Sequence, residues 1–338
     1  MEALAVHYRP TSFEEVCSQQ SIIRILRRQI ELKQLKNCYL FCGASGCGKT
    51  TVARIFANEI NQYHGSPIEI DGASNNGVDN VKQIISSANE RALDGIYKIY
   101  IIDECHMLTT QAWNAFLKCI EEPPTFTIFI FCTTDPQKIP DTIKNRVMRF
   151  NFNRISSDVI KERLLYICKN EGFINYSDTC DYISRICGGQ MRDAIAYLEK
   201  CADFDVDVKL DNALQALGNY SYSIFFELIN YIIDGSIDGT LKIITDAYQQ
   251  GGDLKLFIDQ FLSFGLDLCK YSLSHDYRMT SLPINLKSEL DRAVNFDGAT
   301  NYYCYIVDKL LALKNMLRTD NNPKSTVEVM LIGMARCQ

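Results

Sequence analysis

The sequence predicts an α/β protein in which a five-stranded parallel sheet covered by helices is followed by three short helices and an all-helical C-terminal domain. Over the first 150 residues, short apolar runs alternate with helical patterns, as in a parallel sheet flanked by helices. The runs at 98–103 and 127–132 are apolar almost throughout, which is typical of strands buried on both faces. From about residue 156 only helical spacing remains.

The elements follow in order along the chain. Strands are predicted at 38–42, 67–71, 98–103, 126–133 and 147–152, with helices at 21–35, 49–61, 77–93, 111–121 and 140–145. Three helices follow at 156–171, 177–187 and 192–201, then an acidic connector at 203–211. The last helices are predicted at 222–233, 237–250, 254–273, 284–294, 301–317 and 326–337. Domains are therefore expected at 1–154, 155–204 and 205–338.

Composition limits the class of protein. The chain has 338 residues, of which 47% are hydrophobic and 22% charged, and this excludes a disordered tail, a small disulfide scaffold and a collagen-like fibre. No apolar run reaches the roughly 18 residues of a membrane span, and the N-terminus lacks the pattern of a signal peptide. We therefore expect a soluble cytoplasmic protein with no membrane partner, located in the host cytoplasm if its source is viral.

The formal net charge is −6, but the negative charge is concentrated after residue 204. Residues 1–204 carry 23 Lys and Arg against 24 Asp and Glu, whereas residues 205–338 carry 12 against 17. An acidic total argues against non-specific coating of nucleic acid, which requires a basic domain. A local DNA-binding surface on the first part remains compatible with these charges.

Fourteen cysteines are scattered along the chain without a Cys-x-x-Cys spacing. In a reducing cytosol such residues are mostly small buried hydrophobic side chains, so we expect them in the core rather than in a metal cage.

A glycine-rich segment carries the strongest chemical signal. It follows an apolar strand, opens a helix and reads Gly43-Ala44-Ser45-Gly46-Cys47-Gly48-Lys49-Thr50, followed by Thr51. This pattern in this context predicts a phosphate-binding loop whose backbone N–H groups face phosphate oxygens. Lys49 is expected to reach the β and γ phosphates, and Thr50 to place its hydroxyl on Mg²⁺.

A second acidic motif completes the predicted site. Asp103 and Glu104 end an apolar strand, so the first is expected in the magnesium shell and the second as the general base for an attacking water. Together with the loop they predict nucleoside triphosphate hydrolysis. Because Asp103-Glu-Cys-His106 also resembles a helicase box, a two-lobed helicase is an alternative, but the helical remainder offers no second α/β lobe.

Six stretches, which include the Asp103 motif, occur in order between residues 7 and 200. They are Tyr8-Arg9-Pro10-x-x-Phe13-x-x-Val16, Glu69-Ile-Asp71-Gly-Ala-Ser74-Asn75-Asn76-Gly77-Val78, Asp103-Glu-Cys-His106-Met-Leu, Trp113-Asn114-Ala-Phe-Leu-Lys118-Cys-Ile-Glu121-Glu122-Pro123-Pro124, Thr133-Thr134-Asp135-Pro136-Gln-Lys138-Ile-Pro140 and Gly188-Gly-Gln-Met-Arg192-Asp193-Ala194. With these motifs the chain resembles the gamma/tau-type ATPase subunits of bacterial clamp loaders, part of DNA polymerase III assemblies in the AAA+ class. The match is dense to residue 200 and weak beyond it.

The resemblance implies an AAA+ core, a three-helix lid and a helical collar. It also implies roles for residues that the motifs match. Thr133 or Thr134 would sense the γ phosphate, Arg192 would reach the phosphates from the lid, and Arg146 would be a finger inserted in trans into a neighbouring subunit's ATP site. The residues expected around the adenine are Tyr8, Arg9, Pro10, Val16 and Cys17.

Three departures from the family pattern stand out. The finger motif Ser-Arg-Cys is Asn145-Arg146-Val147 here, and the usual Gly-Gln is Ser18-Gln19. Relatives carry a four-cysteine zinc module that is replaced by a direct connection at 57–67, so we expect no zinc. From the missing module and the missing C-terminal extension we expect an unusual or viral source.

DNA contacts are expected on two helices. The helix beginning near Asn76 and Gly77 would offer free N–H groups to a phosphate, with Lys82 and Arg91 further along, and Asn114 and Lys118 lie on the helix after Asp103. A solvated helix face remains an alternative for Lys82 and Arg91.

The predicted function is the ATPase subunit of a clamp loader, which uses ATP and Mg²⁺ to load a sliding clamp onto primer–template DNA. Its expected partners are other subunits in a pentameric ring, the clamp and the DNA. The alternatives are another AAA+ DNA-remodelling ATPase, such as a branch-migration motor, and a nucleotide-binding scaffold subunit without turnover.

Overall fold

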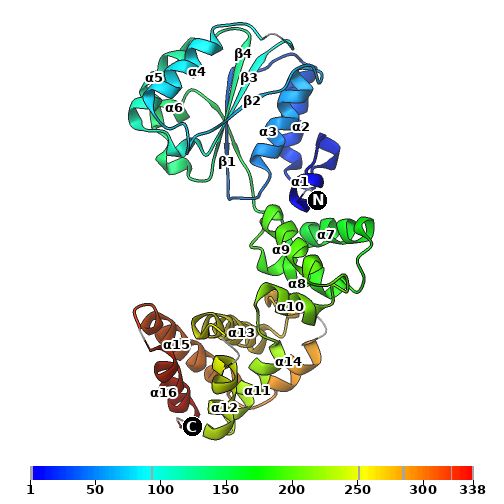
Figure 1. The fold of residues 1–338 in the computed structure, drawn as a ribbon, viewed down its shortest axis with the longest axis vertical. Helices are drawn as coiled ribbons and strands as arrows, with labels where there is room; N and C mark the ends of the chain where they lie inside the picture. Colours follow the sequence, from blue (N-terminus) through cyan, green and yellow to red (C-terminus); the bar gives the residue numbers. More distant parts are fainter. Residues whose placement is uncertain (1–2, 93, 250–251, 284–285, 321, 337–338) are drawn as a thin grey trace. The chain divides into compact units, whose positions relative to one another are not determined.

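The computed structural model describes residues 3–92, 94–249, 252–283, 286–320 and 322–336. The chain divides into two compact units, and Figure 1 shows its elements in chain order. The first unit is Met1–Ile167 with Cys187–Glu199, and the second is Cys168–Ile186 with Lys200–Gln338.

The first unit contains the predicted five-stranded parallel sheet. Its strands are β1 (Cys38–Cys42), β2 (Ile68–Asp71), β3 (Lys98–Asp103), β4 (Thr127–Thr133) and β5 (Met148–Asn151), in the order β2-β3-β4-β1-β5. All four neighbouring pairs are parallel. The predicted fold class is confirmed, and every strand starts and ends within a residue of its prediction.

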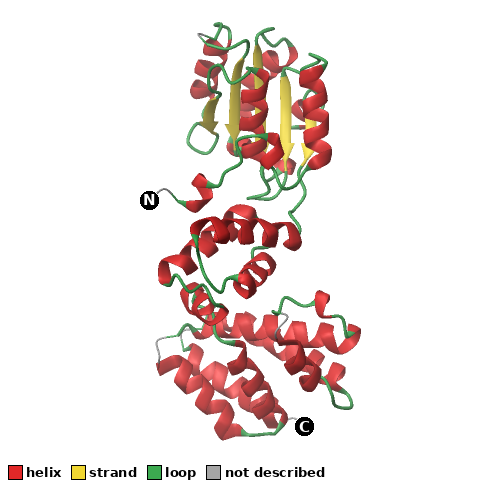
Figure 2. Cartoon of the chain, turned by 90° about the vertical axis from the view of Figure 1, so that its right-hand side faces the viewer, coloured by secondary structure: helices red, strands yellow, loops and turns green. Residues whose placement is uncertain are grey.

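Helices cover both faces of this sheet (Figures 1 and 2). One face packs on α2 (Gln20–Glu31) and α3 (Lys49–Ile60), and the other on α4 (Val78–Ala88), α5 (Thr110–Glu121) and α6 (Asp141–Lys144). Side chains of a strand alternate between the two cores: Tyr39 and Phe41 of β1 lie in one, Leu40 in the other. This double burial is why the strands are apolar throughout.

Two predicted helices in this unit were too long. The helix predicted at 21–35 ends at Glu31, because Lys33 adopts a left-handed backbone conformation with φ 52°. The helix predicted at 77–93 ends at Ala88, where the Asn89 side chain donates a hydrogen bond to Ile85 O at 2.9 Å. Arg91 therefore lies beyond α4 rather than on it, and Leu93 falls outside the described residues.

Short elements complete the first unit. They are α1 (Leu4–His7) and the 3₁₀ turns η1 (Phe13–Glu15), η2 (Cys105–Met107) and η3 (Pro136–Lys138).

The three helices predicted next are confirmed as α7 (Ser157–Glu171), α8 (Ser177–Ile186) and α9 (Met191–Phe204). The division between the units falls inside α7 and α9. The predicted domain limits at 154 and 204 stay predictions.

The second unit is helical, as expected. Beyond α8 it contains α10 (Leu210–Leu217), α11 (Tyr222–Ile233), α12 (Ile237–Gln249), α13 (Leu254–Ser274), η4 (Tyr277–Met279), α14 (Lys287–Ala293), α15 (Ala299–Leu317) and α16 (Pro323–Arg336). Its core is centred on aromatic side chains of α11 and α13, including Phe225, Phe257 and Phe261. The predicted helix positions Gln250, Ile284 and Cys337 lie outside the described residues.

The acidic connector predicted at 203–211 is wrong at both ends. The helix α9 continues to Phe204, and α10 begins at Leu210. The pattern of α10 is helical, because Leu210, Ala213 and Leu217 recur at a spacing of three and four, and Gly218 ends the helix with φ 74°. The four acidic residues of the segment hid this short pattern.

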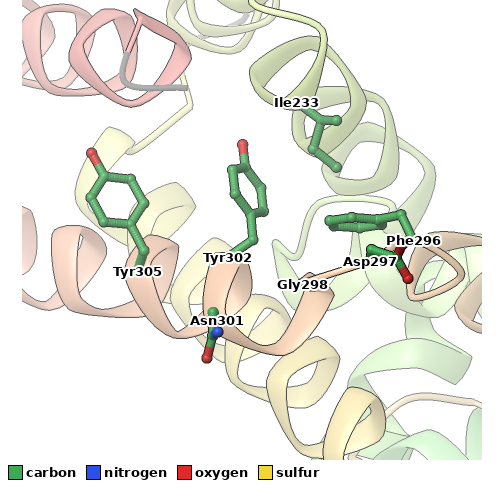
Figure 3. A pocket seen from close by; sticks show the side chains of 7 residues that line it. All are labelled: Ile233, Phe296, Asp297, Gly298, Asn301, Tyr302 and Tyr305. Carbon is green, nitrogen blue, oxygen red and sulfur yellow. The ribbon is translucent and has the colours of Figure 1, made fainter.

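Three further observations concern the whole described part of the chain. Ten of its thirteen cysteines are buried, which confirms that most are core residues. No helix among these residues has the length and apolar character needed to cross a membrane. A cavity of about 500 Å³ in the second unit is lined by Ile233, Phe296, Asp297, Gly298, Asn301, Tyr302 and Tyr305 (Figure 3), and none of these is a predicted site residue.

Candidate functional site

The glycine-rich loop joins β1 to α3 at the carboxyl edge of the sheet. Gly43 N donates a hydrogen bond to Thr133 O of β4 at 3.2 Å, and a Cβ at Gly43 would lie 2.6 Å from Phe152 O. Gly48 immediately precedes α3 with φ 99°, a conformation that L side chains rarely adopt. Glycines therefore fit both ends of the loop, and the N-terminus of α3 opens onto it. Cys47 is buried within the core and fills the loop.

Lys49 is buried in this loop, with 6% of its surface exposed. Its ammonium donates to two backbone carbonyls, Gly43 O at 2.9 Å and Ala44 O at 2.8 Å. No carboxylate forms an ion pair with Lys49 within the described residues. A buried cation compensated only by carbonyl dipoles favours an anion beside it.

The loop meets the acidic end of β3. Thr50 Oγ1 donates a hydrogen bond to Asp103 Oδ2 at 2.7 Å. The parallel register explains this proximity, since β1, β4 and β3 are adjacent and all end at the same edge, where ligands of α/β sheets bind. A hydroxyl beside a carboxylate is a donor set that suits Mg²⁺.

Glu104 is the next residue, and side chains from two segments lie close to its carboxylate. Its Oε2 accepts a hydrogen bond from Thr134 Oγ1 at 2.9 Å and lies 3.1 Å from His106 Nδ1. Glu104 itself has a left-handed backbone conformation with φ 44°, which turns the chain directly after β3. Thr133 is fully buried and accepts a hydrogen bond from Asp135 N, so Thr134 is the threonine that faces the acidic pair.

Two arginines from distant parts of the chain lie near the loop. Arg9 Nε donates to Thr51 Oγ1 at 3.3 Å. Burial lowers the pKa of Arg9, and the positive charges of Arg54 and Arg192 lower it further, while Glu69 and Asp103 oppose this. Met191 N donates to Gly46 O at 3.0 Å, which fixes the start of α9, and hence Arg192, beside the loop.

The remaining residues predicted around the adenine lie on the N-terminal segment before α2. Tyr8 O accepts a hydrogen bond from Arg163 of α7 at 2.8 Å, Val16 is buried in the core next to η1, and Cys17 is exposed. Pro10 is half-buried between them. Gln19, for which no role in the site was predicted, donates through Nε2 to Cys47 O at 3.4 Å and to Asn153 O at 2.7 Å.

Arg146 is not brought to the loop of its own chain. It follows α6, where one guanidinium nitrogen donates to Thr142 O at 2.7 Å and another forms an ion pair with Glu121 at 2.8 Å. This position is compatible with a role in another subunit, which stays a prediction. The partner Glu121 was not predicted, because this pairing depends on how α5 and α6 pack together.

The predicted DNA-facing residues lie on the outside of α4 and α5. Asn76, Lys82, Asn114 and Lys118 are exposed, and Gly77 precedes α4 without a side-chain cap. Asn76 O accepts from Thr109 N at 3.1 Å, so the starts of α4 and α5 are adjacent. Lys82 has an ion partner on its own helix, Asp79 at 3.4 Å.

Arg91, which follows α4, lies over the ring of Phe126, with 5.8 Å between its Cζ atom and the ring centroid. Arg91 and Lys82 thus both have local partners, and their role in binding DNA stays a prediction.

The residues gathered at the loop fit a magnesium–nucleoside triphosphate. A buried ammonium, backbone N–H groups at a helix start and two arginines suit a polyphosphate, and Thr50 with Asp103 suits the metal ion. The described residues contain no group of three His, Cys, Asp or Glu side chains that could hold a metal. The expected absence of zinc stays a prediction.

Comparison with known sequences links the chain to DNA polymerase III. Residues 66–156 match the family model described as "DNA polymerase III, delta subunit". The chain is 35% identical to DNA polymerase III subunit tau of Bacillus subtilis, over 80% of this chain and 52% of that protein. It is 31% identical to subunit gamma/tau of Mycoplasma genitalium (78% and 48%) and 28% identical to subunit tau of Escherichia coli (77% and 44%). The chain thus spans about half the length of these relatives.

Comparison with solved structures gives the fold. The Thermotoga maritima RuvB Holliday junction branch migration motor aligns with a TM-score of 0.54 and 18% sequence identity, over 73% of this chain and 86% of that one. At this identity the likeness shows a shared fold alone.

Proposed function

The chain is a homologue of the gamma/tau subunits of bacterial DNA polymerase III with an AAA+ fold, and we propose that it is the ATPase subunit of a sliding-clamp loader. In this role ATP binding organises the subunits so that they open a ring-shaped clamp. Hydrolysis, stimulated by primed DNA, releases the clamp closed around the template.

The observation that carries the proposal is the meeting of Thr50 with Asp103 beside the buried Lys49. Two motifs that are 53 residues apart in sequence converge at one sheet edge, and each supplies what the other lacks. The loop supplies positive charge for phosphates, and the strand end supplies carboxylates for the metal ion and the water. A scaffold without turnover does not need both.

Each side chain has a defined task in the proposed reaction. Lys49 and Arg192 place fixed positive charge where the transferred phosphoryl group gains negative charge. Thr50 and Asp103 would hold Mg²⁺, which neutralises phosphate charge when bound. Glu104 accepts the proton of the attacking water, and Thr134, bonded to it, keeps its carboxylate in place. Arg146 acts in trans, so hydrolysis depends on assembly.

The surrounding assignments follow from the same role. Residues 1–154 form the ATPase core, 155–204 the lid and 205–338 a collar that contacts other subunits of a pentameric ring. The exposed faces of α4 and α5 contact the primer–template backbone through Asn76, Gly77, Lys82, Asn114 and Lys118. No zinc is required, and the protein acts in the cytoplasm of a bacterium or of a virus's host.

The proposal is tested on the complex purified through a tag on this chain. ATP turnover is measured alone, with the sliding clamp, and with clamp and primed DNA. We expect clamp and primed DNA together to raise turnover at least severalfold, and Lys49→Ala to remove the increase. Turnover that is the same in all three conditions contradicts a clamp-loader role.

One further measurement separates the alternatives. A branch-migration motor would be stimulated by four-way DNA junctions without any clamp, whereas a clamp loader requires the clamp for full stimulation. A scaffold subunit would bind ATP and show no turnover that depends on Lys49.

A further inference from the structure

The side chain of Arg146 is engaged within its own subunit. Its guanidinium contacts Glu121 Oε1 at 2.8 Å and Thr142 O at 2.7 Å, and both side chains of the ion pair are about half exposed, at 40% and 47%. The pair joins two separate elements, since Glu121 is the last residue of α5 and Arg146 follows α6. Arg146, which the proposed function places in the ATP site of a neighbouring subunit, therefore already has a carboxylate partner in its own subunit.

The end of α5 is an unfavourable place for a carboxylate. The C-terminus of a helix carries partial negative charge, yet Glu121 and Glu122 both stand there. Arg146 compensates Glu121, and Glu122 has no side-chain partner within the described residues. Residues that oppose a local structural preference, without a gain in packing, often mark functional sites.

The same helix face carries the residues proposed to meet DNA. Asn114, Lys118 and Glu121 are spaced by four and three positions and are all exposed, whereas Trp113 and Phe116 are buried. They therefore lie on one side of α5. Lys118 and Glu121 are three positions apart on α5, so a phosphate that contacts Lys118 would lie within one turn of the carboxylate that pairs with Arg146.

We propose that Glu121 is a positioning residue that holds the guanidinium of Arg146 on its own subunit. When DNA is bound on α5, the nucleotide in the neighbouring subunit competes with Glu121 for this guanidinium. This inference rests on the proposed function, in which Arg146 acts in trans. An exposed ion pair is weak, whereas a triphosphate offers Arg146 several charged acceptors in a less solvated site. In the complex without DNA, Glu121 therefore favours the position of Arg146 on its own subunit, but it does not prevent ATP hydrolysis.

The test compares Glu121→Gln with Glu122→Gln in the complex purified through this chain. Both variants remove one carboxylate from the end of α5, and only the first removes the partner of Arg146. From the strength of exposed ion pairs, Glu121→Gln is expected to raise ATP turnover without DNA by up to about fivefold. The KM for ATP and the turnover with clamp and primed DNA should stay within about twofold, and Glu122→Gln should match the unmodified complex.

Further variants separate this inference from the proposed function. Arg146→Ala should abolish DNA-stimulated turnover, and Glu121→Gln added to Arg146→Ala should restore nothing. If Arg146→Ala lowers stimulation but Glu121→Gln behaves like Glu122→Gln, the role of Glu121 is wrong and the finger stands. If Arg146→Ala leaves stimulation intact, the finger and this inference both fail. Glu121→Ala serves as a second variant and should show the same gain as Glu121→Gln.

Discussion

Replacing Lys49 with methionine separates a catalytic role of this side chain from a structural one. The change keeps an unbranched side chain of similar length and removes only the ammonium. In the structure that ammonium donates hydrogen bonds to Gly43 O and Ala44 O, and Lys49 is buried. The substitution therefore removes two hydrogen bonds and one buried charge at the same time.

The two consequences for stability oppose each other. Each hydrogen bond from a charged donor contributes roughly 1.5–3 kcal/mol, whereas keeping an ammonium buried costs several kcal/mol. We therefore expect the free energy of unfolding to change by no more than about 1 kcal/mol, which corresponds to a shift in Tm of less than about 4 °C. Turnover should fall much further, because losing one preorganised donor at a developing charge costs roughly 10²–10³-fold.

The assay measures ATP turnover of the purified complex and the thermal unfolding of the chain on the same preparations. Lys169→Met, which removes an exposed lysine on α7, is the control and should change neither quantity. Turnover of Lys49→Met within threefold of the unmodified complex would refute the site assignment. A loss of turnover matched by a large fall in Tm would show that Lys49 acts through folding.

Three other substitutions test neighbouring parts of the site. Glu104→Gln should retain ATP binding, measured with a fluorescent analogue, and lose roughly 10²–10⁴-fold in turnover, because a general base is removed; equal turnover rules out that role. Thr134→Val removes the hydroxyl that donates to Glu104 and should lower kcat roughly tenfold with KM unchanged, whereas a change confined to KM points to binding alone. In Gly48→Ala the added Cβ meets no atom within 4 Å, so only the backbone φ of 99° opposes the change. We expect the free energy of unfolding in urea to fall by about 1–2 kcal/mol, and an unchanged value would show that the loop tolerates an L residue at this position.

The strands and the phosphate loop could be predicted because their signals are local. A strand buried on both faces must be apolar at consecutive positions, as in Ile99-Tyr-Ile-Ile102 of β3. The loop needs glycines at fixed offsets before Lys49, so its pattern and its conformation coincide. Helix ends were predicted less accurately. The helix α4, for example, ends just before an ordinary asparagine, Asn89, whose side chain donates a hydrogen bond to the backbone.

The meeting of Thr50 with Asp103 followed from two motifs, but two other contacts between distant residues could not be predicted from the sequence. The pairing of Thr134 with Glu104, and of Arg146 with Glu121, depends on which strands and helices are neighbours. The strand order β2-β3-β4-β1-β5 is not encoded in any single segment. The short helix α10 was not predicted for another reason. Its three apolar residues at helical spacing follow a charge-rich stretch whose composition is typical of a connector.

The uneven burial of the thiols gives the chain natural points for chemical labelling. Burial raises the pKa of Cys38 and of Cys201 to about 12, so these sulfurs stay protonated and unreactive at neutral pH. Cys17 in the first unit and Cys304 in the second are exposed, and Cys304 Sγ lies 3.1 Å from Cys269 Sγ. A dithiol-chelating arsenical at Cys269 and Cys304 would then place one fluorophore on the second unit, whereas a dye at Cys17 would disturb the proposed adenine site. The fluorescence of the arsenical offers a readout of nucleotide-driven change in the second unit without any engineered residue.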